Sequence, residues 1–441
     1  MSLMLANSSV VIRTRYRDIL GCAIIGSIGI LILYPIILRL TYYSDEILSL
    51  YPVAVQSLTA SLKIWIRPYG YFIILAANKI YLPLWLGVSL FCEVGATILS
   101  ALACERLFER QLPKAGWWIL GLANPLLFYL FAQSECVSQA LSNVLLAGAL
   151  LAFISERHGL QGQPPPGWRA DRLAVFINLM AAALFFTKEL AVAAAVVLPA
   201  ATALIRVKAK RLSPFFLLSL LLPIAAASGW IFLKLNFPSS MFPALEGHYS
   251  LKLNPIAWGE NFITTLAFPI TPLPSSFLAF ELLRPLWVVV ALGSVTLFLG
   301  GLLRASLRQP KVALPLLVVA GCCAPMILIK PSEIYSTMIA PFAASIVLLF
   351  GVSKASRLSL VYGLLLYGAS LGNAIIYSHG PDFQLFGLKH LQYSIYDKYY
   401  QHDPICPIGT TAHIAWDETA SGEYRIPEFL PNIRGQPLCV Q

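Results

Sequence analysis

Long apolar stretches separated by short charged segments follow one another along most of the chain. A helix that crosses a membrane needs about 20 consecutive, mainly apolar residues, and the pattern predicts about eleven transmembrane helices. They cover 19–40, 81–104, 115–133, 137–154, 173–187, 190–205, 214–234, 285–303, 312–329, 335–352 and 358–377. The sequence therefore predicts an all-α, polytopic membrane protein whose transmembrane domain covers residues 1–377.

Basic residues fall at alternate ends of these spans. Because cytoplasmic loops are rich in Lys and Arg, we expect the N-terminus on the cytoplasmic side. Two long loops, 41–80 and 235–284, and a polar C-terminal segment, 378–441, are then on the outer side. The basic residues of the predicted inner segments are Arg13, Arg15, Arg17, Arg106, Arg110, Lys114, Arg157, Arg169, Arg172, Arg206, Lys208, Lys210, Arg211, Arg304, Arg308, Lys311, Lys354 and Arg357.

The composition agrees with a membrane protein. Hydrophobic residues make up 58% of the chain and charged residues only 12%, whereas soluble proteins carry about 25% charged residues. The formal net charge is +10, but in a membrane protein excess Lys and Arg reports topology. We therefore expect contact with the lipid bilayer and no binding of nucleic acid.

Asp45 and Glu46 are adjacent carboxylates that directly follow the first span. Charge beside a membrane is costly and is by default a functional hypothesis. Partial removal from water at such a place can raise the pKa of a carboxyl group toward the range of a general base. A solvated loop after a helix is the alternative interpretation.

The rest of the first outer loop combines apolar and polar positions. Its apolar residues recur at intervals of three or four, which predicts an amphipathic helix lying in the outer membrane interface. These residues are Leu48, Tyr51, Val55, Leu58 and Leu62.

Cys406 and Cys439 are the two cysteines of the polar C-terminal segment, and the other six lie in or beside apolar stretches. Cysteines in apolar stretches usually act as small core residues. The pair in the tail predicts a disulfide, and hence an oxidising compartment on the outer side.

Glu93 lies within the second predicted span, and Glu135 lies between the third and fourth. A carboxyl group inside a membrane is a candidate functional group, although Glu93 could instead be protonated and hydrogen-bonded. The histidines show no metal-ligand spacing. No cofactor is firmly predicted, and a divalent ion at Asp45 and Glu46 stays open.

Four short stretches, in this order, resemble motifs of the GT-C glycosyltransferases, which include protein O-mannosyltransferases and aminoarabinose transferases. The stretches are Asp45-Glu46, Arg67-Pro68-Tyr69-Gly70-Tyr71-Phe72, Phe185-Phe186-Thr187-Lys188-Glu189, and Lys330-Pro331-Ser332-Glu333-Ile334-Tyr335 followed by Pro341. The chain departs from the family at Glu189, where Gly is common, and at Ile334-Tyr335, where Arg-Tyr is common.

The resemblance implies an enzyme that moves a hexose or pentose from a polyprenyl-phosphate donor, with inversion at the anomeric carbon. The acceptor would be a lipid-linked glycan, a polysaccharide or a protein at the outer face of the membrane. Asp45 would be the general base for the acceptor, and Glu46 would assist it or hold a second polar group.

The same resemblance implies cations that bind the donor phosphate. A cation beside the leaving phosphate stabilises the charge that develops on it, and a guanidinium can bind phosphate with two hydrogen bonds. The candidates are Arg67, Lys188, Lys330 and Arg284. For Lys188 the alternative is a side chain that extends from a span end to the interface.

Two other classes of protein stay open. A transporter or flippase of lipid-linked sugars would share the hydropathy, but is expected to show repeats and interrupted helices, and the sequence shows no internal repeat. An O-antigen polymerase or ligase would usually carry an Arg-rich outer loop, whereas loop 235–284 has only Lys252 and Arg284. The expected location is a bacterial inner membrane with the site facing the periplasm; an endoplasmic reticulum membrane with a luminal site is the alternative.

Overall fold

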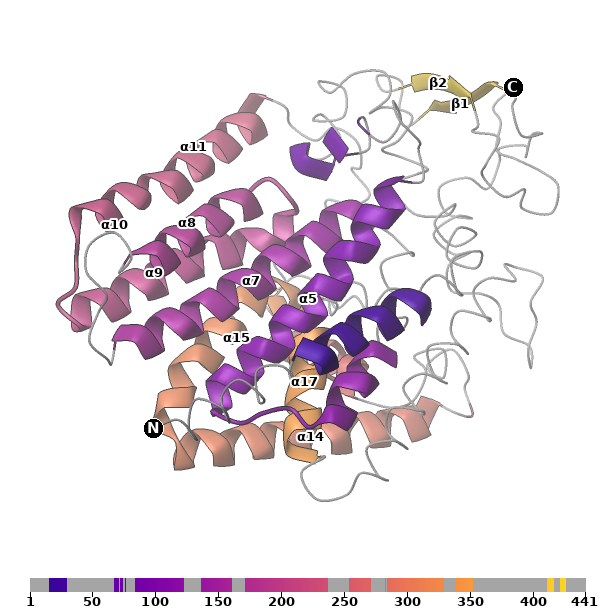
Figure 1. Ribbon diagram of the computed structural model, residues 1–441. Coiled ribbons are helices and arrows are strands. Elements are labelled where there is room, and N and C mark those ends of the chain that lie inside the picture. Colours follow the sequence, from indigo (N-terminus) through magenta and orange to yellow (C-terminus); the bar gives the residue numbers. More distant parts are fainter. Residues whose placement is uncertain are drawn as a thin grey trace.

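Helices account for nearly all of the chain that the computed structural model describes (Figure 1). The described residues are 16–29, 67–70, 72–73, 76, 84–122, 136–160, 171–236, 254–270, 282, 284–328, 338–351, 411–415 and 421–425. The helices are α5 (Leu84–Phe108), α7 (Cys136–Leu160), α8 (Arg172–Leu184), η3 (Glu189–Ala191), α9 (Val192–Lys208), α10 (Pro214–Ser219), α11 (Leu221–Asn236), α13 (Pro255–Ile270), α14 (Arg284–Arg308), η5 (Pro310–Val312), α15 (Ala313–Leu328) and α17 (Ala340–Gly351). Residues 16–29 and 114–122 are also helical.

Five helices of this described part are long and apolar enough to cross a membrane. They are Gly87–Phe108, Val137–Leu160, Glu189–Lys208, Pro214–Asn236 and Arg284–Arg308, with mean hydropathies from 1.7 to 2.3. Shorter apolar helices cover Arg172–Leu184, Pro310–Pro325 and Ala340–Phe350, each within or close to a predicted span. The chain is a helical integral membrane protein, and the count of eleven spans stays a prediction.

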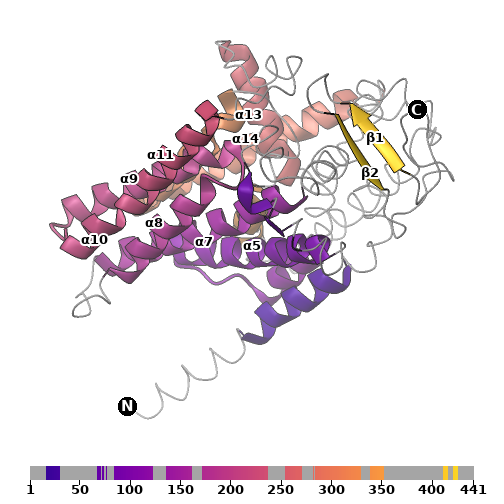
Figure 2. The same cartoon turned by 90° about the horizontal axis from the view of Figure 1, so that it is seen from above.

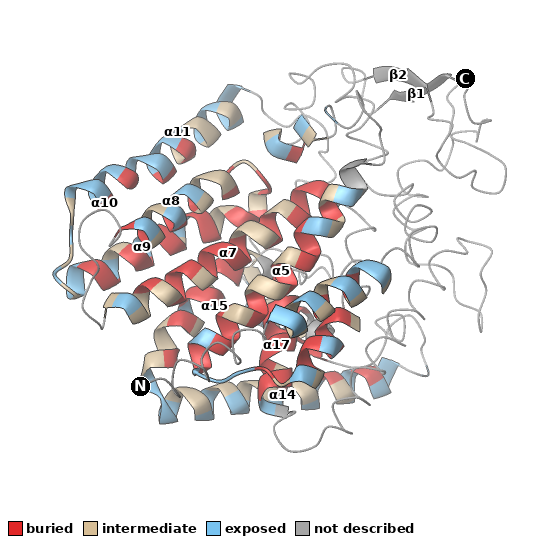
Figure 3. Ribbon diagram, viewed as in Figure 1, coloured by how far each residue is buried: buried red, intermediate tan, exposed pale blue. Residues whose placement is uncertain are grey.

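The helices α5, α7, α8 and α9 form the centre of the bundle (Figure 1). The apolar window of Val137–Leu160 is 78% buried, against 22% for Pro214–Asn236 and 17% for Arg284–Arg308. Figure 3 shows the same contrast between the buried α7 and the exposed α10, α11 and α14. Exposed apolar side chains such as Phe232 and Leu297 are stable against lipid, because lipid tails are as apolar as the side chains.

Two further contacts complete the bundle. Helix 16–29 packs on helix 114–122, where Gly121 allows a close approach: an added Cβ would lie 2.9 Å from the carbonyl oxygen of Cys22. Helix α13 packs between α14, α15 and α17, and the side-chain amide of Asn261 donates to the carbonyl oxygen of Ile327 at 2.7 Å. The sequence did not predict α13, which lies within the range interpreted as the second outer loop, 235–284.

A two-stranded antiparallel hairpin lies in the C-terminal segment 378–441. Strands β1 (Thr411–Ala415) and β2 (Ser421–Arg425) pair with His413 opposite Glu423 in the backbone register, and in both views the hairpin lies outside the helix bundle (Figure 1 and Figure 2). The described part of the transmembrane domain is all-α, as predicted, and the two strands in the tail were not predicted from the sequence.

A buried ion-pair cluster joins the ends of four helices at one end of the bundle, called here the Arg206 end. Arg206 of α9 donates through Nε to Oε1 of Glu156 at 2.7 Å and pairs with Asp171, just before α8. Ser213, the N-cap of α10, donates to Oδ2 of Asp171 at 2.6 Å, and the guanidinium lies 4.8 Å from the centre of the Phe216 ring. The cluster therefore fixes the end of α7, the start of α8, the end of α9 and the start of α10 together.

This arrangement agrees with the predicted alternation of these spans. Arg157, Arg172 and Arg206 lie in segments that the basic-residue pattern assigned to one side, and the structure brings those helix ends together. The opposite ends of α7, α8 and α9 meet around Lys188.

The Arg206 cluster yields a stability prediction. Replacing Arg206 by Met leaves two buried carboxylates without their cation, and breaking a buried pair in this way costs about 3–5 kcal/mol. We expect Arg206→Met to lower the unfolding temperature clearly in detergent. The matched control is Lys208→Met, because Lys208 is on the same helix turn and is exposed. Equal unfolding temperatures for the two variants would contradict the prediction.

Candidate functional site

A cluster of buried polar and charged side chains lies at the opposite end of the bundle from Arg206. Its members come from α5, α7, the corner between α8 and α9, and the segment 67–70, and we call it the Lys188 cluster. They are Arg67, Glu93, Ser138, Gln139, Ser142, Asn143, Thr187, Lys188 and Glu189, all buried except Glu189, whose side chain is 22% exposed. Buried charge within a membrane protein is costly and is a functional-site hypothesis by default.

The corner between α8 and α9 carries the central residues of this cluster. Helix α8 ends at Leu184, whose carbonyl oxygen accepts a hydrogen bond from the Thr187 hydroxyl at 2.9 Å. Lys188 then takes an extended conformation (φ −155°, ψ 145°), and Glu189 begins η3. The extended residue interrupts the helical path, so that Lys188 lies in a break between two apolar helices.

The Lys188 side chain points into the protein and not to the surface. It is 1% exposed, and its Nζ donates to Oε1 of Gln139 at 2.6 Å. Gln139 Nε2 in turn donates to Oδ1 of Asn143 at 2.9 Å. This geometry contradicts the alternative in which Lys188 extends to the interface, because an extended side chain would be exposed.

Arg67 reaches the same corner from the segment that follows the predicted interfacial helix. Its Nη2 and Nε lie 2.8 and 3.1 Å from Oε2 of Glu189, and the side chain is 1% exposed. Glu189 occupies the position where the GT-C pattern commonly has Gly. The departure from the pattern therefore supplies the carboxylate that holds Arg67 beside the residue that follows Lys188.

The segment 67–70 packs directly on this corner. The Tyr69 ring meets the Phe186 ring edge to face at a centroid distance of 6.0 Å, and the Tyr69 amide donates to the Phe186 carbonyl oxygen at 3.5 Å. An added Cβ at Gly70 would lie 2.4 Å from Oγ of Ser138, so any larger residue there would force the Ser138 hydroxyl to move. Two of the four stretches that resemble GT-C motifs are thus in contact.

Glu93 lies in α5 and is fully buried, with neither carboxyl oxygen hydrogen-bonded within the described part of the chain. Glu93 was predicted from the sequence as a candidate, whereas Gln139, Ser142 and Asn143 were not, because they are neutral polar side chains within an apolar stretch. Their spacing of three to four residues, matched on α5 by Ser89, Glu93 and Thr97, was the available signal.

The structure does not test several predicted site residues. Asp45, Glu46, Lys330, Glu135, Cys406 and Cys439 lie outside the described residues. Arg284 is the first residue of α14 and is exposed, so its role as a phosphate ligand stays a prediction. Five cysteines in the apolar helices, Cys22, Cys92, Cys104, Cys322 and Cys323, are buried and form no disulfide, as predicted.

In the described ranges, no three His, Cys, Asp or Glu side chains lie together in a way that could hold a metal ion. The divalent ion considered at Asp45 and Glu46 falls outside those ranges and is not tested.

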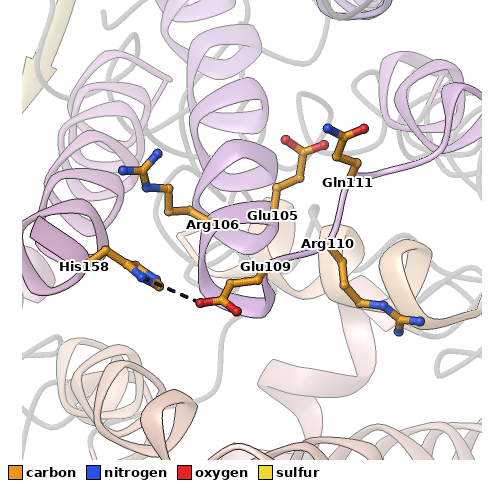
Figure 4. A pocket seen from close by; sticks show the side chains of 6 residues that line it. All are labelled: Glu105, Arg106, Glu109, Arg110, Gln111 and His158. Atoms are coloured by element: carbon orange, nitrogen blue, oxygen red, sulfur yellow. Dashed lines mark ion pairs between the residues drawn. The ribbon is translucent and has the colours of Figure 1, made fainter. Parts of the chain in front are cut away.

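A pocket of about 360 Å³ lies at the C-terminal end of α5, away from the Lys188 cluster (Figure 4). Figure 4 shows His158 pointing at Glu109, with Nδ1 3.9 Å from Oε1. Lys311 Nζ lies 2.5 Å from the same oxygen, and this hydrogen bond holds the pKa of Glu109 below its usual value. The acid is exposed and paired with its basic neighbours, which is typical of a solvated surface. The Lys188 cluster, buried and built from four parts of the chain, is the stronger candidate site.

Fold and site together define a helical integral membrane protein with a buried, charged cluster at one end of its bundle. Comparison of the chain with protein-family models, with curated proteins and with solved structures finds no match. The GT-C resemblance therefore stays a prediction that rests on the four stretches.

The contact between Gly70 and Ser138 can be tested with one substitution that introduces a steric clash and a second that removes it. Gly70→Ala places a Cβ against Oγ of Ser138, and overpacking of this kind typically costs about 1–3 kcal/mol. Ser138→Ala removes that oxygen, so the double variant should unfold at a higher temperature than Gly70→Ala alone.

Gly87→Ala is the control, since nothing lies within 4 Å of an added Cβ there. It should leave the unfolding temperature unchanged or raise it, because Ala is the better helix former. If Gly70→Ala behaves like Gly87→Ala, segment 67–70 does not pack on α7 as described.

Proposed function

We propose that the protein is a membrane glycosyltransferase that takes a sugar from a polyprenyl-phosphate donor and transfers it to an acceptor at the outer face of the membrane. The observation that carries the proposal is the meeting of Arg67 with the Lys188-Glu189 corner. The two stretches are 122 residues apart in the chain, and each contributes a buried cation to one end of a membrane bundle.

Two buried cations suit the chemistry of the donor. When the bond between the anomeric carbon and the phosphate oxygen breaks, negative charge develops on the polyprenyl phosphate that leaves. Fixed cations beside that oxygen stabilise the charge without having to reorganise during the reaction. Gln139 holds Lys188 and Glu189 holds Arg67, so both cations are preorganised in this way.

The roles proposed for the residues that act on the acceptor come from the sequence alone. In the proposal, a hydroxyl or amine of the acceptor attacks the anomeric carbon from the face opposite the phosphate, and the configuration inverts. Asp45 takes the proton of that nucleophile, and Glu46 assists or holds a second polar group. Because segment 67–70 continues the loop that carries Asp45, its packing against the corner supports a common site.

One observation favours the transporter or flippase of lipid-linked sugars as a second candidate. Glu93 is a carboxyl group buried inside α5, well within a span, and transporters place such groups along their substrate pathways. A flippase would move the lipid-linked sugar between leaflets and leave its glycosyl bond intact, so the two candidates differ in their product.

Transfer can be measured on purified protein in lipid nanodiscs. The donors are a panel of hexosyl and pentosyl polyprenyl phosphates, with undecaprenyl and dolichyl chains; a membrane lipid and glycan extract supplies the acceptor hydroxyls and amines, and the product measured is free polyprenyl phosphate. We expect release with at least one donor, and we expect Lys188→Met to lower the rate by about 100-fold or more, as for the loss of one charge-stabilising group.

The matched control is Lys234→Met. Lys234 lies in the last turn of α11, is exposed, and rests 5.4 Å from the centre of the Trp230 ring, so its loss should leave release unchanged. Movement of intact donor across a bilayer with no release of polyprenyl phosphate would instead favour the flippase. Unchanged release by Lys188→Met would remove Lys188 from the donor site.

A further inference from the structure

The pocket at the C-terminal end of α5 is separate from the Lys188 cluster, and the proposed reaction does not use it. Its volume is about 360 Å³, and charged groups of both signs are among the side chains that line it: Glu105, Arg106, Glu109, Arg110, Gln111 and His158 (Figure 4). It lies where the span Gly87–Phe108 ends. Because phospholipid headgroups cover the ends of membrane spans, the pocket is at headgroup depth.

Glu109 occupies a backbone position at which Gly is common. Its φ is 52°, in the left-handed region that residues other than Gly seldom adopt. The Arg110 amide donates to the Glu105 carbonyl oxygen at 3.1 Å, which ends α5 in a Schellman cap, a motif that usually has Gly at the position of Glu109. The backbone alone would therefore favour Gly, and the end of the helix does not require the Glu109 carboxylate.

The Glu109 carboxylate uses one of its two oxygens within the protein. Lys311 Nζ and His158 Nδ1 lie 2.5 and 3.9 Å from Oε1, whereas Oε2 has no hydrogen bond or ion pair to any residue that the structure describes. Arg106, in the last turn of α5, is exposed, and Figure 4 shows its guanidinium on the same side of the helix as His158. An acceptor oxygen and a guanidinium, one helical turn apart on neighbouring positions, are thus both open to a ligand.

We infer that this pocket binds the ethanolamine headgroup of a phospholipid. That headgroup carries a phosphate and a primary ammonium two carbons apart, which matches the two signs of charge in the pocket. Arg106 binds the phosphate oxygens, and Oε2 of Glu109 accepts a hydrogen bond from the ammonium. The helix dipole places partial negative charge at this end of α5, which also favours the ammonium.

The same two residues discriminate against other headgroups. A choline headgroup has a quaternary nitrogen, which has no N–H to donate to Glu109. A glycerol headgroup is anionic overall and has no cation to place beside the carboxylate. The inference does not depend on the proposed function, because the pocket lies away from the Lys188 cluster and needs no sugar donor.

Binding of three lipids to the full chain in detergent, measured by native mass spectrometry, tests the inference. The lipids are dioleoyl phosphatidylethanolamine, phosphatidylcholine and phosphatidylglycerol, which share their acyl chains and differ only in headgroup. We expect the ethanolamine lipid to bind about tenfold more tightly than either of the others, the size of one hydrogen bond to a charged group. Equal binding of all three, as in general contact with a bilayer, or tighter binding of the glycerol lipid would overturn the inference.

Two substitutions at Glu109 test its role. Glu109→Gln should lower the affinity for the ethanolamine lipid to that for the choline lipid. Glu109→Gly should do the same while supplying the residue that the backbone favours. Since an exposed ion pair contributes little to stability, Glu109→Gly should unfold at a temperature no lower than that of the unaltered protein. If either variant keeps the tenfold preference, Glu109 does not select the headgroup and the inference fails.

Arg106→Gln tests the phosphate contact and should weaken the binding of all three lipids together, because each has a phosphate. Its matched control is Lys208→Gln, since Lys208 is likewise an exposed cation in the last turn of a span, α9. The control should bind the three lipids as the unaltered protein does. Equal lipid binding by Arg106→Gln and Lys208→Gln would overturn the assignment of the phosphate to this pocket.

Discussion

The packing of α7 against the corner between α8 and α9 depends on one constraint, the burial of the Lys188 ammonium. A charge removed from water needs hydrogen-bond partners at fixed distances, and Lys188 finds one on another helix, at Gln139. Holding this contact fixes α7 against the corner between α8 and α9. The neighbouring Glu189 then binds Arg67, which brings in a segment from the first predicted outer loop.

Much of the fold could be predicted because a helix that crosses lipid needs a long apolar stretch, which can be seen directly in the sequence. Apolar stretches gave the helices α5, α7, α9, α11 and α14, and the basic residues gave the ends that meet at Arg206. The helix α13 was missed because its polar residues, such as Asn261, and the prolines around it resemble a loop, while its stability comes from packing and from the bond to Ile327. Such tertiary contacts leave no periodic trace in the sequence.

The charged residues of the site could be predicted from the sequence, but the pairs that they form could not. Arg67 and Lys188 are cations at unusual places and were found on that basis, but the sequence could not show that Glu189 binds Arg67. Gln139 and Asn143 were overlooked because amides carry no net charge, although inside a membrane protein they are costly to bury unless hydrogen-bonded. In an apolar helix, uncharged polar residues four positions apart therefore carry as much information about a site as a charge does.

Both ends of the bundle hold a buried arginine against carboxylates, Arg206 at one end and Arg67 at the other. At one end Arg206 lies against two carboxylates, Glu156 and Asp171, which neutralise it and make it a structural brace. At the other end Glu189 binds Arg67, and the Gln139 amide oxygen accepts a hydrogen bond from Lys188. In the proposed function the donor phosphate binds at the end where Arg67 and Lys188 are both buried, and Arg206 at the opposite end serves only to hold the helix ends together.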